Sequence, residues 1–304
     1  TGSITIEGGA GGPGVAANGS GDVLLEARGA GGDVIINADV VSGTGNITLD
    51  AGNDLAVNAA VTTGGAGTIY LTSGNDTTID SQLTSASGDI LVDSSGDITQ
   101  DASINSTSGD VGLIAGGTLT QTTNGDIMTG GDVLVEAGND WTMADGTVIT
   151  ATGNVAGQAI AGDLTLGLIT STNVALTASD NIIDANAGSL NIAADNLSLR
   201  AEGGLIGNHD DGNGTPGLND NAIDITVSTL AANAESGIYI SEADGLTVTT
   251  VAAVTVDIES VVRVNFNSTT NDVSEDRTTA SLEDLSTDTD GPIKLVSLAG
   301  SLMI

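Results

Sequence analysis

Apolar and polar residues alternate along most of this chain in short runs, and a glycine-containing turn ends most runs. In residues 46–51 (NITLDA) every second position is apolar, a Gly-Asn-Asp turn follows, and residues 55–59 (LAVNA) alternate again. A period of two indicates a β-strand with one apolar face. No helical period of 3.6 residues persists, and frequent glycine disfavours helix. The pattern therefore predicts an all-β chain of short strands.

One strand phrase recurs with the form G-[DN]-[IV]-x-[LIV]-x-[AS], and its copies start 19 to 24 residues apart. Each repeat holds three short alternating segments and three corners. A single repeat cannot bury its apolar side, so repeats must stack on one another. We therefore predict a right-handed parallel β-solenoid (β-helix) with about 21 residues and three short strands per coil. The nine copies start at Gly21, Gly45, Gly67, Gly88, Gly109, Gly131, Gly153, Thr172 and Asp195.

The same pattern divides the chain into a regular stack and two interruptions. Residues 1–202 are predicted to be regular β-solenoid repeats, 203–222 a polar loop excursion, and 223–266 continued solenoid. Residues 267–291 are an acidic, Ser/Thr-rich insertion, which we expect to be an exposed loop or hairpin. Residues 292–304 return to a coil whose alternation joins smoothly onto the first phrase. We therefore expect the solenoid to continue beyond this segment, with further units stacked head to tail.

Composition supports a folded core under an acidic surface. The chain has 40 acidic and 5 basic residues, a net charge of −35, yet 39% of its residues are hydrophobic. Disordered chains combine high charge with low hydrophobicity, which is not the case here. Few aromatic residues among many Val, Ile, Leu, Ala and Gly predict a narrow core without room for large rings. The four aromatic residues are Trp141, Tyr70, Tyr239 and Phe266.

The charge and the lack of long apolar runs argue against several partners. A strongly acidic surface repels nucleic acid and anionic membranes. No run of 18 apolar residues occurs that could insert into a membrane. We therefore expect neither nucleic-acid binding nor membrane insertion.

We do not expect the chain to be an enzyme. A β-helix polysaccharide lyase would need a basic residue beside clustered acids, and a hydrolase would need a suitable carboxylate pair. His209 is the only histidine, so neither a Ser-His-Asp triad nor a histidine-rich metal site can form within the chain. Such a lyase or hydrolase is kept as an alternative function. The basic residues lie in different repeats, at Arg28, Arg200, Arg263, Arg277 and Lys294.

Calcium is the one cofactor for which the sequence offers ligands. The loop 208–220 places Asp210, Asp211, Asn213 and Asp220 among glycines, and hard cations prefer such oxygen ligands. The spacing is not that of an EF-hand, and an ordinary Asp/Asn/Gly turn accounts for the same residues.

A ladder of corner residues is the second place where an ion could bind. Asp or Asn recurs at one position of the repeat, and coils in register would bring successive members within about 4.8 Å of each other. The turn preference of Asp and Asn explains the recurrence without an ion. The ladder would contain Asp22, Asn46, Asp89, Asp110, Asp132 and Asn154.

The repeat phrase, the GND turns and residues 197–248 (LSLRAEGGLIG to GIYISEADGLTV) resemble giant repetitive bacterial surface proteins related to filamentous haemagglutinin. The resemblance implies a secreted β-helix used in adhesion, aggregation or biofilm matrix. We therefore expect a structural or adhesive segment of an extracellular surface fibre or stalk. The alternative is a binding module of an adhesin, in which the loop 208–220 or 267–291 contacts a glycan or a cell-surface receptor.

Overall fold

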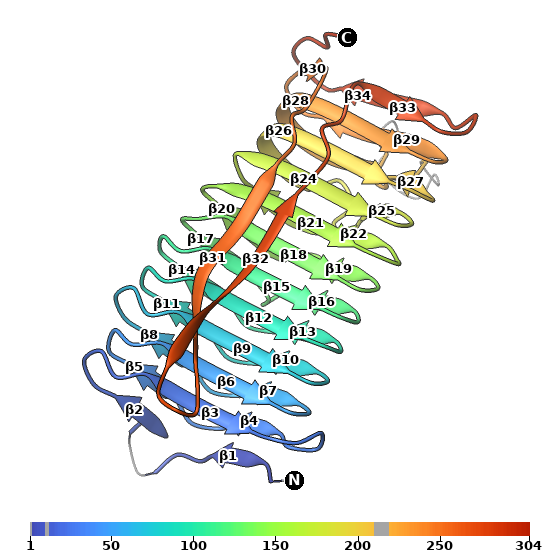
Figure 1. Cartoon of the computed structure of the whole chain (residues 1–304). Coiled ribbons are helices and arrows are strands. Elements are labelled where there is room, and N and C mark those ends of the chain that lie inside the picture. The colour runs from blue at the N-terminus through green and yellow to red at the C-terminus, as the bar shows by residue number, and fades with distance from the viewer. Residues whose placement is uncertain (1, 10–11, 210–218) are drawn as a thin grey trace.

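The computed structural model describes residues 2–9, 12–209 and 219–304, and every regular element within them is a β-strand. One wound sheet holds 32 strands, and a separate hairpin holds two (Figure 1). Strands stack in parallel about 22 residues apart, in about ten coils. The predicted all-β parallel β-solenoid is therefore confirmed. In the described ranges no helix is long and apolar enough to cross a membrane.

Three faces run along the stack, and in most coils each face receives one strand. The long-strand face consists of β3 (Val23–Ala27), β6 (Ile47–Ala51), β9 (Ile69–Ser73), β12 (Ile90–Ser94), β15 (Val111–Ala115), β18 (Val133–Ala137), β21 (Asn154–Ala159), β24 (Asn173–Ala178), β26 (Ile192–Ala201), β28 (Ile223–Ala234), β30 (Thr247–Val248) and β33 (Leu285–Thr287). The second face consists of β1 (Ile4–Ile6), β4 (Val34–Ile36), β7 (Leu55–Val57), β10 (Thr77–Ile79), β13 (Ile98–Gln100), β16 (Leu119–Gln121), β19 (Trp141–Met143), β22 (Leu164–Leu166), β25 (Ile182–Asp184), β27 (Leu205–Ile206), β29 (Gly237–Glu242) and β34 (Ile293–Ser297). The third face consists of β2 (Val15–Ala17), β5 (Val40–Ser42), β8 (Val61–Thr63), β11 (Leu83–Ser85), β14 (Ile104–Ser106), β17 (Ile127–Thr129), β20 (Val148–Ala151), β23 (Leu168–Thr170) and the first halves of β26 and β28.

The nine repeat phrases of the sequence lie in register on the long-strand face. Val23 pairs with Ile47, Ile47 with Ile69, and the series continues coil by coil to Leu197. These side chains point inward and join one continuous buried core. A slip of one residue would turn every apolar side chain outward, so the alternation determines the register.

Glycine opens most repeats because consecutive coils approach closely at this corner. A Cβ on Gly88 would lie 2.2 Å from the carbonyl oxygen of Gly67 in the preceding coil. A buried hydroxyl completes the corner: Ser85 Oγ donates to that carbonyl at 2.8 Å and accepts from the Gly88 N–H at 2.8 Å. Ser106 makes the matching pair of bonds one coil later. The Ser or Thr that precedes most of these glycines by two to four residues therefore stabilises the stacking of the coils.

The expectation that the core has no room for a large ring is wrong in one coil. Trp141 is fully buried, and its Nε1 donates to Gln121 Oε1 at 2.9 Å. The space comes from Gly157 on β21, where a Cβ would lie 2.2 Å from the Trp141 ring. The facing positions in the neighbouring coils are Val135 and Leu176. One glycine in the next coil thus replaces an aliphatic side chain and admits part of the indole.

One hairpin leaves the stack, and it begins earlier than the sequence indicated. β31 (Thr255–Val264) pairs antiparallel with β32 (Thr270–Thr278), although residues 223–266 were expected to continue the solenoid. The insertion interrupts one strand of the long-strand face, because β30 and β33 pair with successive parts of the same strand, β28. A strand that packs on the outside of a face has the same alternation of apolar and polar residues as a strand within that face. The sequence pattern therefore does not distinguish the hairpin strand from a coil strand. Residues 267–291 contain β32 and β33, and residues 292–304 contain β34, which pairs with β29.

Candidate functional site

The outward side of the long-strand face carries an unusually apolar row of side chains. The fourth residue of each repeat phrase, the first of the two positions written as x, points outward. Tyr70, Leu91, Leu134 and Ala156 are nevertheless buried, which an exposed row would not be. The sequence holds a signal for a covering element in these outward apolar residues. The repeat phrase does not express this signal, because it specifies only the inward positions.

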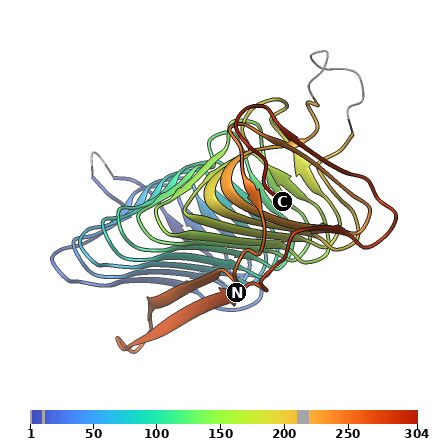
Figure 2. The same cartoon turned by 90° about the horizontal axis from the view of Figure 1, so that it is seen from above.

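The hairpin β31–β32 covers this row. It runs back along the stack over β21, β18, β12, β9 and β6 and lies outside the wall of coils (Figures 1 and 2). Val256, Ile258 and Val261 are fully buried against the outer row and form a second apolar cluster, separate from the core. A register shift between Ile258 and Val261 lets both face the coils although they are three residues apart. At Gly112 a Cβ would lie 2.7 Å from Leu91 Cδ1, so this glycine leaves space for the Leu91 side chain beneath the hairpin.

Hydrogen bonds from the coils hold the edge of β31. The N–H of Val264 donates to Thr48 Oγ1 at 2.8 Å, and the N–H of Val262 donates to Thr68 Oγ1 at 2.9 Å. Both threonine side chains belong to buried residues on the long-strand face. They satisfy main-chain donors that the hairpin would otherwise bury without partners.

Three arginines connect the hairpin to the stack. Arg263 pairs with Asp50 at 2.6 Å, and Arg277 pairs with Glu136 at 2.7 Å. At the tip, the Arg28 guanidinium lies 4.3 Å from the centre of the Phe266 ring. Three of the five basic residues in the chain therefore serve this one contact.

The predicted corner ladder exists and is held by main-chain hydrogen bonds. Asp110 Oδ1 accepts from the Asp132 N–H at 2.7 Å, and Asp89 Oδ1 accepts from the Asp110 N–H at 2.8 Å. Asn46 and Asn154 make the corresponding contacts with Asp22 and Asp132, each at 2.7 Å. An acceptor for the next coil's amide explains Asp or Asn at this position. Sodium or divalent ions along the ladder stay a prediction.

The docked hairpin increases the repulsion between carboxylates along the ladder. Burial and the nearby carboxylates of Asp89, Asp132 and Asp257, opposed by the hydrogen bond from the Asp132 N–H, together raise the pKa of Asp110 to about 6. Burial and Glu259 likewise raise the pKa of Asp89. Asp257 and Glu259 belong to β31, so the docked hairpin itself brings like charges together.

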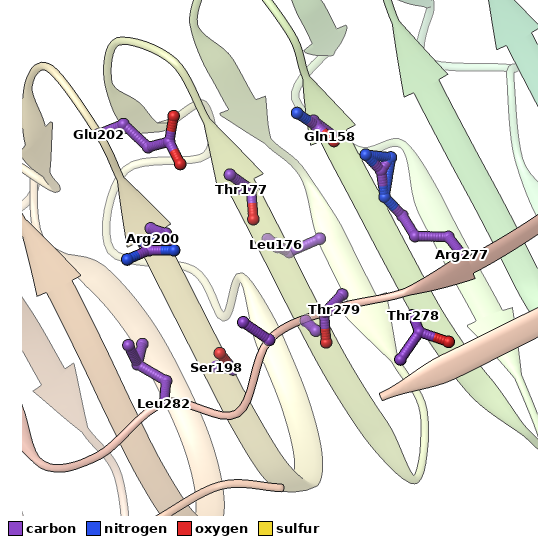
Figure 3. A pocket seen from close by; sticks show the side chains of 12 residues that line it. Gln158, Leu176, Thr177, Ser198, Arg200, Glu202, Arg277, Thr278, Thr279 and Leu282 are labelled. Atoms are coloured by element: carbon purple, nitrogen blue, oxygen red, sulfur yellow. The ribbon is translucent and has the colours of Figure 1, made fainter. Parts of the chain in front are cut away.

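A polar cleft of about 210 Å³ lies where the hairpin rejoins the stack. Its floor carries Gln158, Thr177 and Arg200, which stand at the same position of three successive coils. The chain that leaves β32 forms one wall (Figure 3). In the described part of the chain no carboxylate lies within 4.0 Å of the Arg200 guanidinium. Glu202 and Ser198 also line the cleft.

Only one of the four predicted calcium ligands lies among the residues that the structure describes. Asp210, Asp211 and Asn213 lie outside the described residues, whereas Asp220 lies within them. Among the described residues, no group of three or more His, Cys, Asp or Glu side chains is arranged to hold a metal ion. The calcium site therefore stays a prediction.

His209, beside that loop, is exposed. Its ring meets Tyr239 edge-on at 6.5 Å between ring centres. It also lines a cavity of about 370 Å³ together with Asn208, Asn221 and Asp184.

Fold and outer face together define a β-solenoid repeat protein that carries a docked hairpin on one face. Comparison with protein-family models, with curated proteins and with solved structures found no match. The fold is compatible with repetitive β-helix proteins such as adhesins. The likeness to filamentous-haemagglutinin-type proteins rests on the repeat phrase, the GND turns and residues 197–248 of the sequence.

Proposed function

We propose that this chain is a structural repeat segment of an extracellular bacterial surface fibre or stalk, to which further coils of the same kind add end to end. The observation that carries the proposal is the in-register stack with open strand edges at both ends. Among the described residues, β1 and β2 pair only with β4 and β5, and β34 pairs only with β29. An unpaired parallel edge is a template for another strand.

The C-terminal end offers apolar surface as well as hydrogen-bonding groups. Ile293, Val296, Leu298 and Met303 are among the exposed large hydrophobic residues of the chain, and all lie in or beside the last coil. Another coil stacked there would bury Ile293, which is 44% exposed, as its paired residue Ile238 in the preceding coil is buried. The acidic surface keeps the sides of such a rod apart, which favours growth along the axis over lateral clumping.

Location and adhesion are part of the proposal and rest on the resemblance of the repeat phrase. An antibody against this chain should label fibres or stalks on intact cells that make the native protein. Label confined to permeabilised cells would contradict an extracellular location.

End-to-end assembly can be tested by light scattering and electron microscopy on the purified chain. We expect rods that lengthen as the protein concentration rises. Ile293→Glu should shorten them, because it places a charge at an inward position of the last coil. Met128→Glu is the matched control, since Met128 is 61% exposed but lies on the side of the stack, on β17. Rods of one fixed length at all concentrations, or equal effects of both variants, would contradict the proposal.

A further inference from the structure

Arg200 differs from the other three arginines of the chain. Arg28, Arg263 and Arg277 each have a carboxylate partner at 2.6 to 2.8 Å. Arg200 is partly buried on β26 and has no such partner among the described residues, although acids outnumber bases eightfold in the sequence. A guanidinium carries five N–H donors in a planar fork suited to a carboxylate. Its position in a cleft leaves that fork available to a ligand.

The other lining groups suit a ligand rich in hydroxyls. Thr177 and Ser198 supply hydroxyls, and Gln158 supplies an amide that can donate and accept. Glu202 also lines the cleft and adds a hydrogen-bond acceptor (Figure 3). A simple inorganic anion would use the arginine but would gain nothing from Glu202. A sugar with one carboxylate could use both.

The size of the cleft limits the ligand to about one ring. Its volume of about 210 Å³ equals that of roughly seven water molecules at ~30 Å³ each. One side is open to solvent, so a bound sugar ring can remain part of a longer chain.

The wall of the cleft is held in place before any ligand arrives. Thr279 and Val254 exchange two hydrogen bonds, with the Val254 N–H donating to Thr279 Oγ1 at 2.9 Å and the Thr279 N–H donating to Val254 O at 2.9 Å. Leu282 and Val251 form a further bridge at 2.8 and 3.0 Å. The Arg277–Glu136 pair fixes the end of β32. A rigid wall lowers the entropy cost of binding.

We propose that this cleft binds the carboxylate of an acidic sugar residue through Arg200, while Glu202 accepts hydrogen bonds from the sugar hydroxyls. The site uses one charge-assisted contact and a few neutral hydrogen bonds, so a single residue binds weakly, with a Kd on the order of 1 mM. Several such sites along a fibre would add avidity for a polymer of acidic sugars.

NMR titration of the isotope-labelled chain with glucuronate, at constant ionic strength, tests the site. We expect saturable shifts in the amides around 198–202 and 277–280, and none with glucose. Arg200→Gln should weaken binding at least tenfold, and Glu202→Gln about threefold. Lys294→Gln is the control, since Lys294 also has no ion-pair partner among the described residues but lies outside the cleft. Unchanged circular dichroism of each variant shows that the fold is intact.

Three outcomes would overturn the proposal. Absence of saturable shifts with glucuronate would remove the site. Equal weakening by Lys294→Gln would show attraction to overall positive charge instead of a cleft. Sulfate that binds as tightly as glucuronate, with no effect of Glu202→Gln, would show a simple anion site without recognition of a sugar.

Discussion

Trp141 and Gly157 form a matched pair at the scale of single residues. The indole fills the space that the missing side chain of Gly157 leaves in the next coil. We expect Gly157→Ala to destabilise the chain by about 1–3 kcal/mol, because a Cβ would overlap the ring. Chemical denaturation followed by circular dichroism measures the change. Gly9→Ala is the control, because nothing lies within 4 Å of a Cβ there.

Trp141→Leu should rescue part of that loss. Leucine occupies the paired positions in the coils on either side, Leu119 and Leu164, so it fits the same inward row. The double variant Trp141→Leu/Gly157→Ala should be more stable than the sum of the single effects predicts, with a coupling of about 0.5–3 kcal/mol. Strict additivity would show that the two residues do not share the space.

Asp110 makes stability depend on pH. Its folded-state pKa of about 6 lies above the usual value near 4, so the folded chain binds the proton more tightly than the unfolded chain. The contribution of this group to stability is fully present below about pH 4 and is lost as the pH rises through 6. Asp110→Asn removes the charge and keeps an oxygen for the Asp132 N–H, as Asn46 Oδ1 does for the Thr68 N–H elsewhere in the ladder.

We therefore expect Asp110→Asn to raise the stability at pH 7.5 by on the order of 1 kcal/mol, after allowance for solvent screening of a half-buried group. The gain should vanish near pH 4, where the wild-type carboxyl is protonated. Thermal melts across this range measure it. Asp272→Asn, which removes one charge from an exposed position of β32, should show no such crossover. An equal effect of both variants would point to net charge alone.

At the scale of elements, the sequence predicted the coil strands but not the docking of the hairpin. Inward alternation is the same in every coil, so nine phrases predict the register without ambiguity. The docking of the hairpin depends on outward side chains at a position where the repeat phrase allows any residue, such as Tyr70 and Leu91. Gly112 leaves room for the Leu91 side chain. Contacts between residues some two hundred positions apart, such as Thr68 with Val262, leave no local pattern.

Ile258 is the best place to test whether the hairpin is a separate unit. It is fully buried between the hairpin and the outer row, and Ile258→Ala should cost about 2–4 kcal/mol of docking energy. Hydrogen exchange should speed up in β31 and β32 while the coil strands keep their protection. Ser274→Ala, on the exposed side of β32, should leave exchange unchanged. Equal loss of protection in coils and hairpin would show that the two unfold together.

At the scale of the whole molecule, charge opposes the stack that the apolar core maintains. A net charge of −35 repels itself along the rod, whereas only three ion pairs occur among the described residues. Partly exposed ion pairs contribute about 0–1 kcal/mol each, so the stability lost when salt weakens them is small. Repulsion among the acids is spread over every coil and is screened by the same salt.

We therefore expect the melting temperature at pH 7.5 to rise by roughly 5 °C or more between 10 and 500 mM NaCl, since relief of a few kcal/mol moves a chain of this size by that much. The effect should shrink near pH 4, because carboxyls with ordinary pKa values are then largely protonated and little repulsion remains to be screened. A salt effect that persists unchanged at pH 4 would instead reflect general strengthening of apolar burial. A fall in melting temperature with salt at pH 7.5 would mean that the arginine contacts of the hairpin outweigh the repulsion. The acidic surface would then be a minor influence on the stability of the rod.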